Sequence, residues 1–151
     1  MKNLYTVKAI KTFIGMEGHG FNADLYLNNN KIAFVYDDAS GGEINFQFNT
    51  PEQETDFQKF AVEKLGSEYG DYASAETLIN NMVYELLQRR DLKALLNKKT
   101  VCHDSSGLFT FKTKFKGNEA RMIEHVLTHE KSAILLNNIP FDDAFKLYLE
   151  A

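Results

Sequence analysis

The segment from Phe21 to Phe48 constrains the fold most, because apolar and polar residues alternate strictly in its two outer parts. Residues 21–27 and 44–48 place an apolar side chain at every second position, which is typical of strands that bury one face. Asn28–Asn30 and Asp37–Gly42 flank a third apolar run and are rich in residues that tolerate left-handed backbone. The pattern predicts a three-stranded antiparallel meander whose apolar face must be covered by another element.

The composition is that of an ordinary globular protein. The chain has 151 residues, of which 44% are hydrophobic and 25% are charged, and its twelve Phe and seven Tyr are ample for a core. We therefore expect a single domain over residues 1–151, within which 1–97 and 98–151 could form two lobes. The net charge of −4 argues against a dedicated nucleic-acid binder, which would carry a strong basic excess.

The sequence gives no indication of a targeting or membrane segment. Lysines interrupt the apolar residues of the first fourteen positions, unlike a signal peptide, and no apolar run approaches the roughly 20 residues of a membrane span. The single cysteine, Cys102, excludes an internal disulfide framework and a cysteine zinc cluster, and it fits a reducing compartment. The expected location is the cytoplasm.

One more strand and two long helices are predicted around the meander. Residues 4–14 alternate imperfectly, which a bulge or an edge position would explain. Residues 50–53 (Thr-Pro-Glu-Gln) are a strong start signal for a helix that ends at Gly66, and a second helix runs from Ser74 to about Asn97. The buried stripe of the first helix is expected to consist of Phe57, Phe60, Ala61 and Leu65.

The last third of the chain predicts a smaller β-hairpin–helix–strand–helix unit. Residues 100–103 and 108–115 pair as a hairpin, residues 118–129 form a helix, residues 132–136 form a short strand, and Pro140 opens a final helix. The inward face of the helix over 118–129 is expected to hold Ala120, Ile123, Val126 and Leu127. The fold class is therefore α+β, with an N-terminal antiparallel β-meander that is covered by two helices and followed by this unit.

Exposed turn residues are the first candidates for contacts with a partner. The glycine-rich loop over residues 15–20 (GMEGHG) lacks the Lys-Ser/Thr and the helix that follow a phosphate-binding loop, so a simple turn is the favoured interpretation. Glu17 and His19 lie in this loop and are predicted to bind a partner. Asp37 and Asp38 lie in a hairpin turn, where Asp is a common turn former, and complete the predicted partner-binding set on this sheet.

The histidines and the cysteine are the candidates for metal binding or catalysis. His125 and His129 share a helix face, and His103 or Glu130 would be the third metal ligand, but no Glu follows the first His as in metalloproteases. Neighbours in a strand point to opposite faces, so Cys102 and His103 do not form a nucleophile–base pair. The favoured interpretation is two solvated histidines and a buried cysteine, with no catalytic residue, metal or cofactor.

A row of lysines is the one basic feature that the strand pattern predicts. The strand over residues 108–115 and the residue after it place Lys112, Lys114 and Lys116 on one face, opposite the Phe side chains. With basic residues at the end of the long helix, the row could form a patch that contacts nucleic acid or an acidic protein surface. A solvated outer strand face is the simpler interpretation.

Two stretches resemble small, uncharacterised proteins of phages and other bacterial mobile elements. They are residues 15–48, GMEGHGFNADLYLNNNKIAFVYDDASGGEINFQF, and residues 109–138, FTFKTKFKGNEARMIEHVLTHEKSAILLNN, which together are about half of the chain. The resemblance implies no known activity and no catalytic residues. It implies a setting inside a bacterial host cell, where phage-like genes of this size often encode proteins that bind and inhibit a host defence factor.

The sequence therefore favours a non-enzymatic protein–protein interaction module, and the resemblance points to an inhibitor of a bacterial defence system of the anti-CRISPR kind. The expected partner is a host protein or nucleoprotein complex. The alternative is a nucleic-acid-contacting accessory protein that uses the lysine row, followed by a small metal-dependent hydrolase built on the three histidines. The many aromatic residues also allow a homodimer, and no membrane contact is expected.

Overall fold

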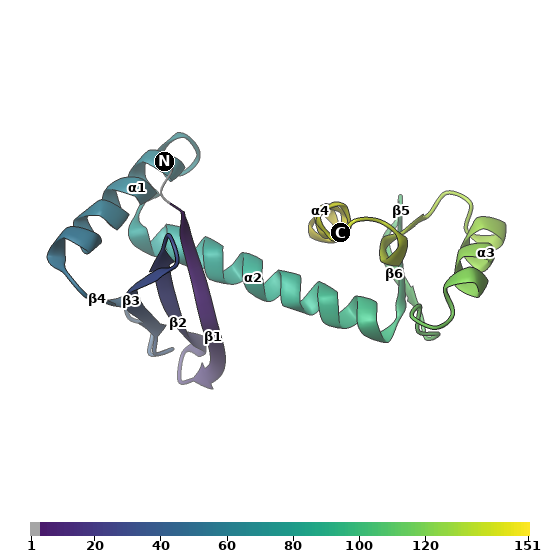
Figure 1. The fold of residues 1–151 in the computed structure, drawn as a ribbon, viewed down its shortest axis with the longest axis horizontal. Coiled ribbons are helices and arrows are strands. Elements are labelled where there is room, and N and C mark those ends of the chain that lie inside the picture. The colour runs from purple at the N-terminus through teal and green to yellow at the C-terminus, as the bar shows by residue number, and fades with distance from the viewer. Residues whose placement is uncertain (1–3) are drawn as a thin grey trace. The chain divides into compact units, whose positions relative to one another are not determined.

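The computed structural model describes residues 4–151, and its fold is α+β, as the sequence predicts (Figure 1). Four antiparallel strands form the first sheet in the order β1-β2-β3-β4, and three strands form a second sheet in the order β6-β5-β7. The elements in chain order are β1 (Tyr5–Gly15), β2 (Gly18–Leu27), β3 (Asn30–Asp37), β4 (Asn45–Phe48), α1 (Pro51–Tyr69), η1 (Gly70–Tyr72), α2 (Ala75–Lys98), β5 (Thr100–Asp104), β6 (Gly107–Phe111), α3 (Glu119–His129), β7 (Ile134–Leu135), η2 (Leu136–Asn138) and α4 (Phe141–Glu150).

The chain forms two compact units, residues 1–85 and residues 86–151, and the boundary falls inside α2 instead of near Asn97. The reason is the packing of Leu92, which is fully buried in the core of the second unit. The apolar stripe of a long helix is continuous in sequence, so its period does not reveal which part of the helix packs with which sheet.

The alternating apolar residues of the N-terminal sheet are buried on one face, as the sequence predicts. In β2, every second residue from Phe21 to Leu25 is buried, while the residues between them are half-buried. Asn28 and Asn29 connect β2 to β3 with φ angles of +49° and +74°, a region that Asn tolerates better than most residues. β1 is an edge strand and contains a register shift around Ala9, so both explanations of its imperfect alternation are confirmed.

The segment predicted as a glycine-rich loop is a tight hairpin. β1 continues to residue 15 and β2 begins at Gly18, so Met16 and Glu17 alone form the turn. Gly18 has a φ of +116°, which L side chains rarely adopt. A Cβ on Gly20 would clash with the carbonyl oxygen of Asp37, so only glycine allows this close approach of β2 and β3.

Helix α1 begins with the predicted capping box but extends further than expected. The Thr50 hydroxyl accepts a hydrogen bond from the backbone N–H of Gln53 at 3.2 Å, and the Gln53 side chain accepts one from the Thr50 N–H at 3.1 Å. The helix passes through Gly66, its predicted end, and continues to Tyr69. A glycine inside a helix costs only about 1 kcal/mol, which the packing of the flanking turns can offset.

One face of the N-terminal sheet is covered by α1 and the first part of α2 (Figure 1). Phe57 of α1 is fully buried, and its ring centroid lies 5.0 Å from that of Tyr5 and 6.1 Å from those of Phe46 and Phe48. The buried residues that α2 adds to this unit are Leu78, Ile79 and Val83. The aromatic cluster around Phe57 therefore joins two strands, β1 and β4, to α1.

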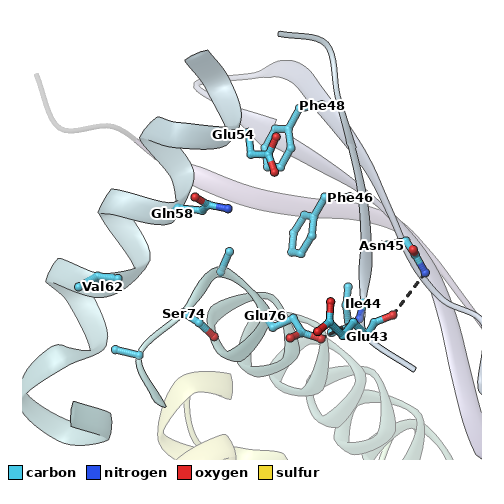
Figure 2. A pocket seen from close by; sticks show the side chains of 12 residues that line it. Glu43, Ile44, Asn45, Phe46, Phe48, Glu54, Gln58, Val62, Ser74 and Glu76 are labelled. Carbon is cyan, nitrogen blue, oxygen red and sulfur yellow. Dashed lines mark hydrogen bonds between the residues drawn. The ribbon is translucent and has the colours of Figure 1, made fainter. Parts of the chain in front are cut away.

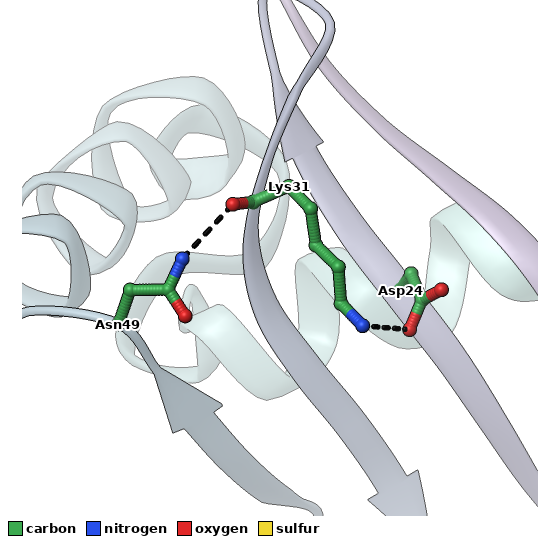
Figure 3. Close-up of polar contacts among 3 residues, drawn as sticks. All are labelled: Asp24, Lys31 and Asn49. Carbon is green, nitrogen blue, oxygen red and sulfur yellow. Dashed lines mark hydrogen bonds and ion pairs between the residues drawn. The ribbon is translucent and has the colours of Figure 1, made fainter.

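Polar contacts fix the chain where it leaves the sheet for α1 (Figure 3). The side-chain amide of Asn49 donates to the carbonyl oxygen of Lys31 at 3.0 Å, and its backbone N–H donates to that of Ile32 at 2.9 Å. The Lys31 ammonium also pairs with Asp24 at 3.0 Å. An exposed ion pair is worth about 0–1 kcal/mol, so the Asn49 bonds matter more for where α1 begins.

The second unit differs from the sequence prediction at β6, at α3 and at β7, which covers only two of the five residues predicted as a strand over 132–136. β6 ends at Phe111, so the residues up to Phe115 are a connecting segment and not a strand. The buried residues of α3 are Met122 and Val126, whereas Leu127 is 68% exposed. Ala120 is exposed as well, so the predicted inward face is confirmed at Val126, which is buried, but was wrong at Ala120 and Leu127. Apolar residues occur on both sides of α3, and only its docking on the sheet decides which side is buried.

A single side chain links three segments of the second unit. Oδ1 of Asn137 accepts a hydrogen bond from the backbone N–H of Val101 at 2.7 Å. Its Nδ2 donates to the carbonyl oxygens of Leu96 and Lys99, each at 3.0 Å. These carbonyls lie at the C-terminal end of α2, where the helix leaves them without helical partners. Asn137 therefore joins the end of α2 and the start of β5 to η2.

None of the helices within residues 4–151 combines the length and the apolar character that a membrane crossing requires.

Candidate functional site

A groove of about 480 Å³ lies in the N-terminal unit between β4, α1 and the residues that precede and begin α2 (Figure 2). Its floor includes Phe46 and Phe48, whose half-buried rings stack with centroids 5.6 Å apart and an interplanar angle of 11°. Val62 of α1, which is 52% exposed, lines the opposite wall. The groove therefore offers aromatic and aliphatic surface that the fold itself leaves partly uncovered.

The polar lining of the groove is acidic. Glu43, Glu54 and Glu76 all contribute to it, and the part of the chain that the structure describes adds no Lys, Arg or His to this lining. Figure 2 shows Glu54 beside Phe48, at the opposite end from Glu43 and Glu76. The Glu76 carboxylate accepts a hydrogen bond from the backbone N–H of Ile44 at 2.7 Å, so this side chain also ties α2 to the strand segment. A ligand that binds in the groove must therefore be positively charged or uncharged where it meets these carboxylates.

The two units differ strongly in charge. Residues 1–85 contain six Lys and Arg against thirteen Asp and Glu, which gives a net charge of −7. Residues 86–151 contain eleven Lys and Arg against eight Asp and Glu, which gives +3. The modest net charge of the whole chain hides this asymmetry, and each unit suits a partner of opposite sign.

The predicted residues at the turn end of the N-terminal sheet come together in part. The backbone N–H of Glu17 donates to the carbonyl oxygen of Ala39 at 2.7 Å, so the β1–β2 turn contacts the β3–β4 loop. Asp37 accepts from the N–H of Ala39 at 2.9 Å, and Asp38 accepts from that of Ser40 at 3.0 Å. Hydrogen bonds from the Ser40 hydroxyl and backbone hold the pKa of Asp38 below its ordinary value. Both aspartates thus have a turn-forming role.

His19 lies in β2 opposite Ile14, on the hairpin and not in a loop, and it is exposed as predicted. The same hairpin exposes two large apolar side chains that the sequence did not single out: Ile14 is 79% exposed and Met16 is 95% exposed. Exposed apolar side chains beside polar ones are a common feature of contact surfaces. The hairpin end is thus a second exposed surface of the N-terminal unit.

The lysine row does not lie on a strand face. Lys112, Lys114 and Lys116 are all exposed, but they belong to the segment between β6 and α3, because β6 ends at Phe111. The carbonyl oxygen of Thr113 accepts hydrogen bonds from the backbone and hydroxyl of Thr100, at 3.0 and 2.8 Å, which holds this segment beside β5. The lysines therefore share one short segment but not one face of a regular strand.

Arg89 is one of the basic residues in the second half of the long helix that could join the lysines in a patch, but its side chain packs against α4 instead. Its guanidinium pairs with Asp142 at 2.9 Å and lies 4.3 Å from the ring centroid of Phe145. This places Arg89 against α4, where Asp142 lies in the first turn of the helix.

The three histidines do not gather into a metal site. His125 and His129 are neighbours, with ring centroids 4.6 Å apart. Within residues 4–151, however, no three side chains among His, Cys, Asp and Glu are placed to hold one metal ion. His103 lies on β5 and pairs in register with Leu108 and Ile134. The three-histidine site considered for a metal-dependent hydrolase is therefore not formed.

Cys102 is fully buried on β5. Burial, followed by the nearby charges of Glu130 and Asp104, raises the pKa of its thiol from an ordinary 9.0 to about 11. A thiol of this kind is a poor nucleophile at neutral pH, because the thiolate is the reactive form.

We expect Cys102 to resist alkylation in the native protein. At pH 8 the raised pKa lowers the thiolate fraction about 100-fold, and burial slows the reaction further. The measurement is the rate of iodoacetamide labelling by mass spectrometry, with the urea-unfolded chain as the control. Equal labelling rates in the native and unfolded protein would contradict the buried position of this side chain.

Comparison with known proteins found no matching family model, no matching curated protein and no matching solved structure.

Proposed function

We propose that this protein is a non-enzymatic protein-binding module whose N-terminal groove holds a cationic, partly apolar segment of a partner protein. The observation that carries the proposal is the groove itself, in which stacked Phe46 and Phe48 lie among three glutamates without a cation in the described lining. A Lys or Arg side chain fits this chemistry, because its alkyl stem packs on aromatic rings while its charged head meets carboxylates.

The charge of the whole unit supports the same kind of partner. At −7, residues 1–85 attract a basic protein surface over a longer range than the groove alone. The exposed hairpin end, with Ile14, Met16 and Glu17, offers additional contact area on the same unit. Electrostatic attraction of this kind speeds association and selects the partner, and apolar contact supplies the affinity.

In the setting that the resemblance implies, the partner is a bacterial protein or nucleoprotein complex with an exposed basic surface. Defence factors that handle nucleic acid present such surfaces, since they must contact phosphates. The finer form of the proposal is therefore an inhibitor, of the anti-CRISPR kind, that occupies a basic surface of a defence factor. Expression in cells with an active defence system should raise the survival of an invading plasmid, and the loss of this effect in groove variants would link it to the site.

The direct test uses two nine-residue peptides, one with alternating Arg and Leu and one with Glu in place of each Arg. We expect the basic peptide to bind in isothermal titration calorimetry and the acidic peptide not to bind. Combined replacement of Glu43→Lys and Glu54→Lys should weaken binding at least about tenfold, because two charge pairs become repulsive. Neither glutamate is buried, so the fold should tolerate both changes.

The matched control is Glu63→Lys, which makes the same change at an exposed position of α1 outside the groove lining. It should change the affinity less than twofold. Equal weakening by the control would show that only the net charge matters, and failure of the basic peptide to bind the wild type would remove the proposal.

A further inference from the structure

The second unit contains a pocket of about 430 Å³ between the end of β6 and α3. The side chains that give it chemical character are Phe111, Thr113, Arg121, His125, Thr128 and His129. Met122, which is 4% exposed, links this lining to the buried side of α3. The pocket lies wholly within one unit and shares no lining residue with the acidic groove.

The polar residues of this pocket follow the period of the helix. Arg121, His125 and His129 are four residues apart, so they lie on one face of α3, and all three are exposed. The ring of His125 stands edge-on to Phe111, with centroids 5.2 Å apart and an interplanar angle of 90°. The aromatic and imidazole rings thus form a continuous wall beside the guanidinium-bearing side chain.

The donors of this wall match an anion that carries several acceptor oxygens. Arg supplies a planar fork of N–H groups, each imidazole supplies at least one N–H, and each Thr supplies a hydroxyl. Glu124 is the one carboxylate in the lining that the structure describes. Phosphate is an anionic group whose oxygens accept hydrogen bonds from donors of this kind. The rings provide a surface on which a base can stack.

The segment beside the pocket carries more positive charge than the binding of a single phosphate group requires. Lys112, Lys114 and Lys116 lie between Phe111 and α3, and all three are exposed. A ligand with one phosphate does not need three further cations beside the pocket. A strand with successive phosphates does, because each neutralised phosphate releases counterions and adds to the affinity.

We propose that this pocket, together with the lysines of the adjoining segment, binds single-stranded nucleic acid. Arg121, His125 and His129 hold a backbone phosphate, the three lysines of the adjoining segment contact neighbouring phosphates, and a base stacks against the rings of the wall. This site gives the protein a second binding activity, on the unit of opposite charge to the one that holds the acidic groove.

The test is fluorescence anisotropy with a labelled twelve-nucleotide oligothymidine. We expect wild-type binding in 50 mM NaCl and a loss of about 50-fold in affinity at 200 mM, as about four phosphate contacts to a single strand predict. Arg121→Glu should weaken binding at least tenfold, and His125→Ala combined with His129→Ala should weaken it as well. Circular dichroism confirms that each variant is folded.

The matched control is Lys146→Glu, the same change of charge at an exposed position of α4 in the same unit. It should alter the affinity less than twofold, and so should the groove variant Glu43→Lys with Glu54→Lys, which separates this proposal from the first. Equal loss in Arg121→Glu and Lys146→Glu would overturn the pocket assignment. Absence of binding at 50 mM NaCl, or equally tight binding of inorganic phosphate, would overturn the assignment to a strand.

Discussion

Replacing Asn137 with Ala is expected to lower the free energy of unfolding of the second unit by about 2–4 kcal/mol. The change removes three hydrogen bonds at once: one from Val101 N–H and two to the carbonyl oxygens of Leu96 and Lys99. Val101 is fully buried and Asn137 is half-buried, so water replaces these partners poorly. The measurement is urea unfolding followed by circular dichroism, with hydrogen exchange to locate the loss.

Two further variants separate the hydrogen bonds from the volume of the side chain. Asn137→Asp keeps the acceptor for Val101 but replaces the donor with an oxygen that faces two carbonyls, so it should be at least as destabilising as Ala. Asn138→Ala changes the exposed neighbour and should cost less than about 0.5 kcal/mol. A wild-type stability for Asn137→Ala would mean that this side chain does not hold the end of α2.

Features that depend on neighbouring residues in the chain were predicted well from the sequence. The capping box of Thr50 and Gln53, the alternation over residues 21–27 and the turn at Asn28 are all present, because each is decided by local geometry. The end of α1 was predicted wrongly, because at this position a local signal does not decide the structure. Gly66 is a local stop signal, but packing of the helix on the sheet outweighs its cost of about 1 kcal/mol.

Features that depend on docking between elements were not predictable in this way. The face of α3 that is buried, the end of β6 at Phe111 and the boundary inside α2 are each decided by which surfaces meet. The sequence contains a usable signal for the proposed nucleic-acid site, because Arg121, His125 and His129 recur every four residues, whereas a metal-site pattern picks out the two histidines alone. The difference in net charge between the two units can also be counted from the sequence, but only once the boundary between the units inside α2 is known.

The acidic groove had no signal of its own in the sequence. Phe46 and Phe48 belong to an alternating strand and were expected to be covered core residues. The structure leaves them half-buried because β4 has only four residues and lies at the sheet edge, where α1 and the start of α2 diverge from it. A short edge strand beside a helix start is a three-dimensional arrangement, and residues as distant as Ile44 and Glu76 come into contact only after folding.

The Phe57→Ala variant should lower the free energy of unfolding of the N-terminal unit by about 3–5 kcal/mol. Phe57 is fully buried, and its ring contacts those of Tyr5, Phe46 and Phe48, so its loss leaves a cavity at the point where α1 meets the sheet. Phe57→Leu should cost less, because it fills more of the same space. Tyr72→Ala, at a side chain that is 81% exposed, is the control and should cost less than about 0.5 kcal/mol.

The same variant also connects the core to the proposed groove. Phe57 supports Phe46 and Phe48 from the buried side, so without it their stacked pair loses its fixed position and the groove loses its floor. We therefore expect Phe57→Ala to weaken binding of the basic peptide under conditions where the protein is still folded, while binding of the oligonucleotide stays within twofold. Unchanged peptide affinity in folded Phe57→Ala would show that recognition depends on the glutamates alone, and a parallel loss of oligonucleotide binding would show that the variant perturbs both units.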